Sequence, residues 1–101
     1  MTDIKKKVYF KLVAEITAIG ELVHIKREGL SDIYKKVVTL VTSDGQKLYP
    51  EIRNKKLTQL NVLNIHDIVD LEYTFEGSQK GDKLYNNIYI NKIIKYEKEI
   101  K

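Results

Sequence analysis

The stretch "IVDLEYTFEGSQKGDKLYNNIYI", residues 68–90, places two alternating segments on either side of a polar middle that contains glycine. In residues 68–75 the apolar side chains fall on every second position, and Ile88 and Ile90 alternate with more polar neighbours. A period of two is typical of half-buried strands, so the two segments predict a β-hairpin. A tight hairpin turn needs only about two residues. Residues 76–85 are therefore expected to form an unusually long polar loop.

The alternation also sorts the side chains of this region into two faces. Tyr73 and Phe75 share the face of Val69 and Leu71, so both aromatic residues are predicted to lie in the core. The opposite, solvated face carries acidic residues that would repel phosphate, and nucleic-acid binding is expected to avoid it: Asp70, Glu72 and Glu76.

Residues 8–26 are rich in β-favouring side chains, but their alternation changes phase by one residue at Ile19-Gly20. Glycine at a change of phase is typical of a bulge or a sharp bend, so one long bent strand is the favoured interpretation. Two strands joined by a tight turn at the glycine are the alternative. Tyr9 and Phe10 are expected to pack this segment against the barrel or against a neighbouring subunit.

After a turn-rich loop over residues 27–34, a second hairpin is predicted from residues 35–43 and 46–53. Asp44-Gly45, which lies between these two segments, is a favoured sequence for a tight hairpin turn. Pro50 has no backbone N–H, so the second strand of this hairpin is expected to lie at an edge or to end there.

A short helix is predicted after the second hairpin. Asn54 is placed to cap it, and Leu57 and Leu60, three residues apart in "KKLTQL" (55–60), fall on one side. The following "NIHDIV" is expected to turn the chain into the long hairpin.

The composition is that of one small globular domain, with 101 residues of which 43% are apolar. The chain has no cysteine, which excludes disulfides and thiol chemistry, and its two histidines lie far apart without a cluster of carboxylates. No nucleophile–base pair, metal cluster or glycine-rich phosphate loop occurs, so we expect neither an enzyme nor a cofactor. No apolar run approaches ~18 residues, and a cytoplasmic protein is expected.

The charge permits a polyanionic partner. The net charge is +4 and the isoelectric point is near 9.2. Sixteen of the eighteen basic residues are lysines, which suit diffuse attraction to phosphates. Bidentate recognition of guanine in a duplex favours arginine, so sequence-specific duplex binding is not expected.

With the bent strand counted once, the predicted order is three strands, a short helix and two strands. This is the order of the OB-fold, an all-β, five-stranded, partly open Greek-key barrel. We expect the domain to cover residues 8–97, with a flexible segment at 1–7 and a short charged tail at 98–101. Because the loop between the last two strands projects beside the cleft in this fold, residues 76–85 are interpreted as a mobile, ligand-wrapping arm; ordinary variation in loop length is the alternative.

Three motifs carry a family resemblance: "LYPEIRNKKLTQL" (48–60), "LNIHDIVDLEYTFEG" (63–77) and "LYNNI" (84–88). Their order and spacing resemble those of small OB-fold proteins of bacteria and their phages that are related to single-stranded DNA-binding proteins. The resemblance covers roughly four-fifths of the chain, from Ala14 to Glu97. It implies an OB-fold that binds single strands.

The chain departs from this family at three places. His66 stands where the family often has glycine, and the turn is still expected because histidine tolerates left-handed backbone better than most residues. Asn91 stands where the family often has tryptophan, so a favoured stacking platform is replaced. The C-terminal "KEIK" is not the acidic tip of bacterial single-stranded DNA-binding proteins, so recruitment of partners through the tail is not expected.

An OB-fold binds single strands by stacking bases on aromatic rings within a positively charged groove. The groove is expected across the outer faces of the second and third strands, flanked by two projecting loops. Each candidate also has a structural interpretation, such as β-propensity or the pinning of a loop. The candidates are the basic and aromatic residues of these surfaces: Arg27, Tyr34, Lys35, Lys36, Lys47, Tyr49, Arg53, Lys80, Lys83, Tyr85 and Tyr89.

These features favour a protein that binds single-stranded DNA without sequence specificity, in replication or recombination and of phage or bacterial origin. RNA binding is a close alternative, and an OB-fold module for protein interaction or virion structure is a second class. Self-association through the edge strands is also expected, because one small domain covers little of a strand.

Overall fold

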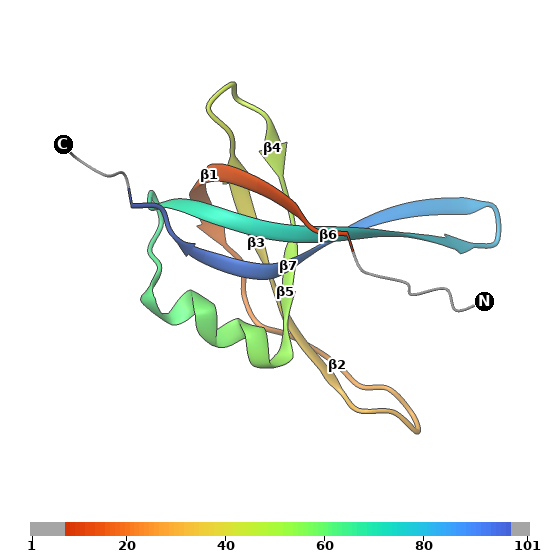
Figure 1. Cartoon of the computed structure of the whole chain (residues 1–101). Helices are drawn as coiled ribbons and strands as arrows, with labels where there is room; N and C mark the ends of the chain where they lie inside the picture. Colours follow the sequence, from red (N-terminus) through yellow and green to blue (C-terminus); the bar gives the residue numbers. More distant parts are fainter. Residues whose placement is uncertain (1–7, 98–101) are drawn as a thin grey trace, which may run out of the picture.

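The computed structural model describes residues 8–97, so the predictions for residues 1–7 and 98–101 lie outside the described residues. Strands make up most of the described chain, and one short 3₁₀ helix interrupts their series (Figure 1). The elements in chain order are β1 (Phe10–Ile19), β2 (Val23–Ile25), β3 (Ile33–Val41), β4 (Lys47–Leu48), β5 (Glu51–Arg53), η1 (Asn54–Val62), β6 (Ile68–Lys80) and β7 (Lys83–Lys95).

Strand β1 closes the sheet into a barrel because it pairs with two different strands. The sheet runs in the order β1-β6-β7-β5-β3-β2, with β4 paired to β3. Residues 10–15 of β1 pair antiparallel with β6, and residues 15–19 pair antiparallel with β3. The strand order therefore returns to β1, as a small Greek-key barrel requires.

The predicted bend in the first strand is confirmed. Segments β1 and β2 run in the same direction along β3, so they form one interrupted strand and not a hairpin turning at Gly20. The register against β3 shifts between Ile16 and Ala18, which places the bulge slightly earlier than the sequence indicated. The N–H of Gly20 donates to the carbonyl of Val37 at 2.8 Å, and a Cβ at Gly20 would lie 3.1 Å from that oxygen. Glycine thus permits the close approach of the two strands.

The second hairpin also forms as predicted. The turn at Asp44-Gly45 has Gly45 at φ +86°, and its N–H donates to the carbonyl of Thr42. Pro50 divides the returning strand into β4 and β5, as its missing N–H suggested. The carbonyl of Pro50 still accepts a hydrogen bond from the N–H of Val38 at 2.9 Å, so β3 remains attached on both sides of the break.

Helix η1 lies across one end of the barrel (Figure 1). Leu60 is buried and Leu57 packs against the core, which agrees with a 3₁₀ helix of about three residues per turn. The predicted cap was wrong. Arg53 occupies the N-cap position without a side-chain hydrogen bond, whereas Asn54 has φ +53° and its Oδ1 accepts from the backbone N–H of Tyr34.

Residues 76–85 do not form the predicted loop. Strands β6 and β7 stay paired as far as Lys80 opposite Lys83, and Gly81-Asp82 form a two-residue turn with Gly81 at φ +60°. The resulting ribbon, here called the arm (residues 76–86), projects well beyond the barrel (Figure 1). Alternating apolar residues mark only strands that cover a core, whereas backbone hydrogen bonds also hold a ribbon of polar residues together.

Phe75 was wrongly predicted to lie in the core. Its side chain is 51% exposed, while Tyr73 is half-buried and packs against the core as expected. The register against β7 shifts between Glu72 and Tyr73, and Phe75 lies past the point where β1 covers β6. Its ring instead contacts that of Phe10, with centroids 4.8 Å apart.

The core fills the barrel between its strands and η1. Its members come from the inward sides of β1, β3, β5, β6 and β7, from the helix and from the residue that follows the helix: Ala14, Ile16, Val38, Leu40, Ile52, Leu60, Leu63, Val69, Leu71, Ile90 and Ile93. In the described part of the chain, no helix is sufficiently long and apolar to cross a membrane.

Candidate nucleic-acid interface

Strand pairing brings one side of β3, β5, β6 and β7 into a single surface, here called the outer face. Residues directly opposite one another in neighbouring strands point to the same side of a sheet. The β3–β5, β5–β7 and β6–β7 registers connect such pairs into one series. The outer face therefore contains Lys35, Val37, Glu51, Arg53, Thr74 and Tyr89.

Glu51 lies at the centre of the outer face, and its side chain is only 12% exposed. Its Oε2 accepts from Nζ of Lys35 at 3.1 Å, and its Oε1 accepts from the guanidinium of Arg53. That guanidinium lies over the ring of Tyr89, 4.8 Å from the ring centroid. Glu51 thus orders two cations and neutralises part of their charge.

Burial raises the pKa of the Tyr89 phenol, and the neighbouring carboxylates of Glu51 and Glu76 act in the same direction against the opposing effect of Arg53. The phenol therefore stays neutral throughout the neutral pH range. A neutral ring with a cation on one side is a suitable stacking partner for a base.

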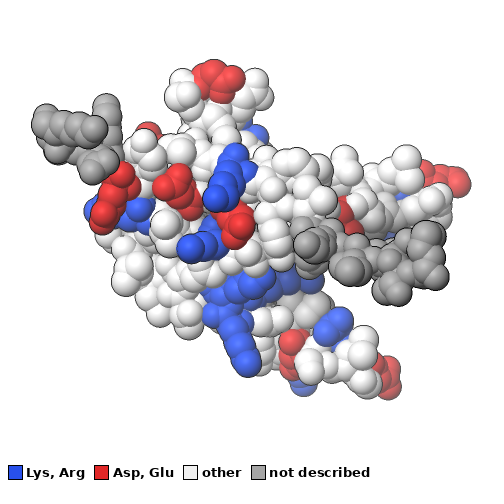
Figure 2. Space-filling model, viewed as in Figure 1, with Lys and Arg blue, Asp and Glu red and all other residues white. Residues whose placement is uncertain are grey.

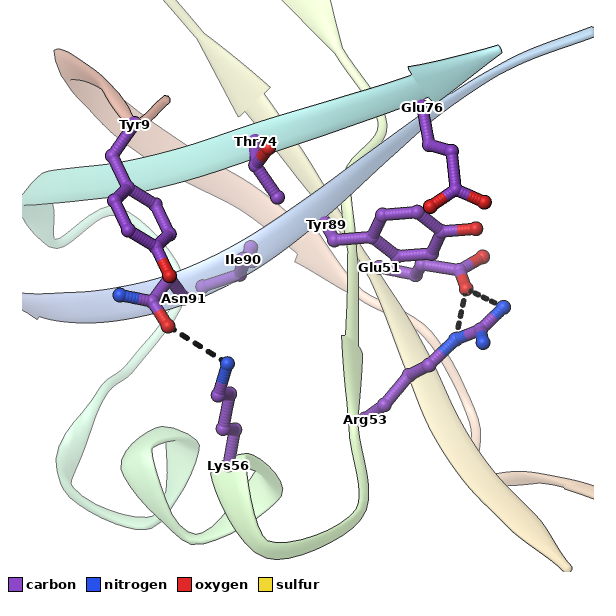
Figure 3. Close-up of a pocket in the computed structure, with 9 residues that line it drawn as sticks. All are labelled: Tyr9, Glu51, Arg53, Lys56, Thr74, Glu76, Tyr89, Ile90 and Asn91. Atoms are coloured by element: carbon purple, nitrogen blue, oxygen red, sulfur yellow. Dashed lines mark hydrogen bonds and ion pairs between the residues drawn. The ribbon is translucent and has the colours of Figure 1, made fainter. Parts of the chain in front are cut away.

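A pocket of about 290 Å³ opens between Tyr89 and Tyr9 (Figure 3). Lys56 of η1 donates to Oδ1 of Asn91 at 2.8 Å, and Asn91 donates to Glu72 at 2.9 Å. Figure 3 shows Tyr9 and Asn91 on one side of this pocket and Tyr89 with Glu51 on the other. Asn91 thus joins the helix to the sheet through hydrogen bonds.

Tyr49 and Lys47 lie on a neighbouring part of the same surface. They border a pocket of about 250 Å³ together with Asn86, Asn87 and Ile88 of β7. The side chain of Tyr49 is 60% exposed, so its ring is free to stack. Figure 2 shows Lys and Arg gathered over the junction of β5 and η1, where the chain reads "RNKK" (53–56).

The arm continues this surface along β7. Tyr85 and Lys83 alternate in phase with Tyr89, and Lys80 pairs directly with Lys83, so all of them point to the same side of the ribbon. Each of Lys80, Lys83 and Tyr85 is exposed. The arm therefore presents two lysines and a tyrosine beyond the barrel.

Three of the candidate residues lie away from this surface. Lys36 pairs with the buried Ile52 and so faces the opposite side of β3 from Lys35. Tyr34 stacks on His24, with centroids 4.4 Å apart, in the hairpin between β2 and β3. In the same hairpin, Arg27 donates to the carbonyl of Ser31. The hydrogen bond from His24 lowers the pKa of Asp32 and holds this hairpin together.

The expected separation of acidic and aromatic sides was wrong. Glu76 lies two residues after Thr74 on the same side of β6, and both residues border the pocket beside Tyr89. Sequence reasoning gave Glu51 and Asn91 no role in this surface, although alternation puts both on the outward sides of their strands, and it did not place Tyr9 there. Glu51 had a signal, because it alternates with Tyr49 and Arg53 on the outward side of its strand.

No protein-family model matches the chain, and no curated protein sequence matches it. Among solved structures, the chain is similar to the second OB-fold domain of replication protein A from Methanococcus maripaludis. The TM-score is 0.65 and the identity 17%, covering 94% of this chain and 90% of that domain. It is also similar to a small single-stranded DNA-binding protein from Streptomyces coelicolor, with a TM-score of 0.50 and 6% identity over 91% and 96% of the two chains. At these identities the likeness establishes the fold, and the chain is an all-β OB-fold.

Proposed function

We propose that the protein binds single-stranded DNA on the outer face and the arm, without requiring a defined sequence. The observation that carries this proposal is the exposure of tyrosine rings along one continuous surface. Tyr49 is 60% exposed and Tyr85 is 43% exposed, while Tyr89 presents a half-buried ring between them and the helix. In a fold whose purpose was only structural, such rings would be expected to pack inward.

The distribution of charge supports separate places for the bases and the phosphates of a bound strand. Glu51 neutralises part of the positive charge of Lys35 and Arg53 at the centre of the outer face, so bases fit there better than phosphates. The exposed lysines lie at the periphery: Lys47 on β4, Lys56 on η1, and Lys80 and Lys83 on the arm. Peripheral lysines attract the phosphates of a strand whose bases stack between them.

The structural neighbours support the same proposal, since one is a domain of replication protein A and the other is described as a single-stranded DNA-binding protein. Under this proposal the protein covers exposed strands during replication or recombination, in a bacterium or its phage. The mixed charge of the outer face predicts modest affinity from one domain.

The test is fluorescence anisotropy of a labelled oligo-dT and of a matched duplex at two salt concentrations. We expect a preference for the single strand, and a fall of log affinity with log salt of slope about −2 to −3.5 if three to five phosphates are neutralised. Tyr49→Ala and Tyr89→Ala should each weaken binding by about 1–3 kcal/mol, the contribution of one stacked base.

The matched control is Tyr96→Ala, which removes an exposed tyrosine just beyond the C-terminal end of β7, away from the arm. This variant should bind like the wild type. Equal affinity for the duplex, or equal losses in all three variants, would contradict the proposal. Absence of binding at low salt would favour a module for protein interaction, and tighter binding of oligo-U than of oligo-dT would identify RNA as the ligand.

A further inference from the structure

A second hollow, of about 460 Å³, borders the ring of Tyr89. Arg53, which lies over the Tyr89 ring, lines the first pocket but not this hollow. The walls of this second hollow include Phe10, Phe75 and Val8. A hollow of this size is within the range of small-ligand sites, about 300–1,000 Å³, and its aromatic walls suit a flat, apolar ring.

Glu76 is the charged group at this hollow. Thr74, Glu76 and Tyr89 border both the hollow and the first pocket, so the carboxylate lies beside the ring that a base would stack on. Figure 3 shows this carboxylate next to the ring of Tyr89. Within residues 8–97, no hydrogen bond or ion pair engages the carboxylate of Glu76. By contrast, Glu51 is held by two cations and Glu72 accepts from Asn91.

We infer that this hollow holds one base of the bound single strand, stacked on Tyr89, and that Glu76 selects guanine there. A carboxylate only accepts hydrogen bonds, and it has two oxygens side by side. The Watson–Crick edge of guanine donates two parallel N–H groups, from N1 and the 2-amino group. The edge of thymine donates one N–H between two carbonyl oxygens, which a carboxylate repels. Unpaired bases are commonly recognised through this edge.

This inference rests on the proposed function and deepens it, because it states which base the Tyr89 site prefers. It also accounts for an acidic residue on a surface that binds a polyanion. The phosphates lie along the lysines of the periphery, whereas Glu76 meets only the edge of a base. One selective position does not define a sequence, so the preference remains compatible with binding along any strand that contains guanine.

The experiment compares labelled oligonucleotides of equal length: all-thymine, alternating thymine–guanine, and alternating thymine–hypoxanthine. Hypoxanthine keeps the N1 donor of guanine and lacks the 2-amino group. The wild type should bind the thymine–guanine strand at least about fivefold more tightly than all-thymine, with hypoxanthine between them. Glu76→Gln should abolish this preference, because the glutamine amide offers a donor that matches the carbonyl of thymine as well.

Asp70→Asn is the matched control, since it removes one negative charge from an exposed position of β6 that does not border the hollow. It should keep the preference for guanine. Both variants should keep the wild-type circular dichroism spectrum, because both side chains are exposed.

Equal affinity of the wild type for all three strands would overturn the inference and leave the proposed function standing. If the preference for guanine survives in Glu76→Gln, the preference is due to the stronger stacking of purines, and this result would also overturn the inference. Failure of the wild type to bind any of the three strands would reject both the inference and the proposed function.

Discussion

The carboxylate of Glu51 lies between the side chains of Lys35 and Arg53, and through Arg53 it supports the ring of Tyr89. A half-buried cation needs such a partner, because removing charge from water is costly unless a hydrogen bond replaces the hydration. The same contacts fix the guanidinium on one side of the ring. At the scale of residues, contacts within the protein therefore hold the ring of Tyr89 in place on the outer face.

Replacing Glu51 with glutamine tests this role. Glu51→Gln keeps the shape but loses the charge-assisted hydrogen bonds to both cations, and the free energy of unfolding should fall by about 1–3 kcal/mol. Denaturant titration measures the change. Glu28→Gln, in the exposed loop between β2 and β3, is the control and should change it by no more than about 0.5 kcal/mol. Equal stability of the two variants would contradict the role of Glu51.

Tyr89 should ionise at higher pH than its ordinary value of about 10, because burial disfavours the charged phenolate. Because the pKa of Tyr89 is higher in the folded protein than in the unfolded chain, the neutral ring contributes fully to stability below the pKa of the unfolded chain. This contribution is lost as the pH rises through the pKa of the folded protein. The difference between the tyrosinate absorbance titrations of wild type and Tyr89→Phe isolates this group. A difference curve centred at or below about 10 would show that the ring is not buried as described.

At the scale of elements, the arm contributes no side chain to the core. The side chains at its two-stranded end are exposed, and it is held by backbone pairing between β6 and β7. The barrel segments of β6 and β7, in contrast, contribute Val69, Leu71, Ile90 and Ile93 to the core. Under the proposed function, the barrel segments of these two strands provide stability and the arm provides contacts to the DNA.

Shortening the arm separates these two roles. Replacing residues 78–85 with Asn-Gly, a favoured two-residue turn, rejoins Gly77 to Asn86, which already face each other. The free energy of unfolding should change by less than about 1 kcal/mol, since no core side chain is removed. Affinity for oligo-dT should fall, and its salt slope should become less negative by about 1.4, because two lysines are lost.

The double variant Lys80→Ala/Lys83→Ala, with the arm intact, is the comparison for that experiment. It should reproduce the change in salt slope and only part of the loss in affinity, the remainder being due to Tyr85. Wild-type affinity in the shortened protein would show that the arm takes no part in binding.

At the scale of the whole molecule, the barrel is closed by pairings between residues far apart in the sequence. β1 must meet both β6 and β3 before the core is complete, and such non-local pairing slows folding. Refolding after dilution from denaturant should therefore take milliseconds to seconds in stopped-flow measurements. The shortened arm should refold at a similar rate, because its pairing is local. Refolding in microseconds would contradict this dependence on barrel closure.

Much of the fold was predictable because local chemistry decides it. Asp44-Gly45 makes a turn in almost any context, Pro50 interrupts a ladder wherever it occurs, and Leu57 and Leu60 mark one side of a helix by spacing alone. His66 adopts φ +80°, as expected of a residue that replaces glycine in a turn. The order of these elements predicted the OB-fold barrel, which the similarity to solved OB-folds confirms.

The candidate site was predictable only in part. Arg53 and Tyr89 were both expected on outward faces, and the structure brings them together. Lys35 and Lys36 were both expected to bind because both lie at the start of their strand, but consecutive strand residues face opposite sides, and the register shows that only Lys35 lies on the outer face. The long hairpin was predicted as a loop because its side chains are polar, and polarity reports exposure but not backbone pairing.

The sequence by itself determined which segments become strands, where they turn and which side chains need burial, because these properties depend on neighbours only a few residues away. The tertiary structure alone decided that Glu51 lies between two cations, that Glu76 borders the ring of Tyr89 and that Tyr9 faces Asn91. The physical reason is the closure of the barrel: it joins strands from opposite ends of the chain in registers that bulges at two places have shifted.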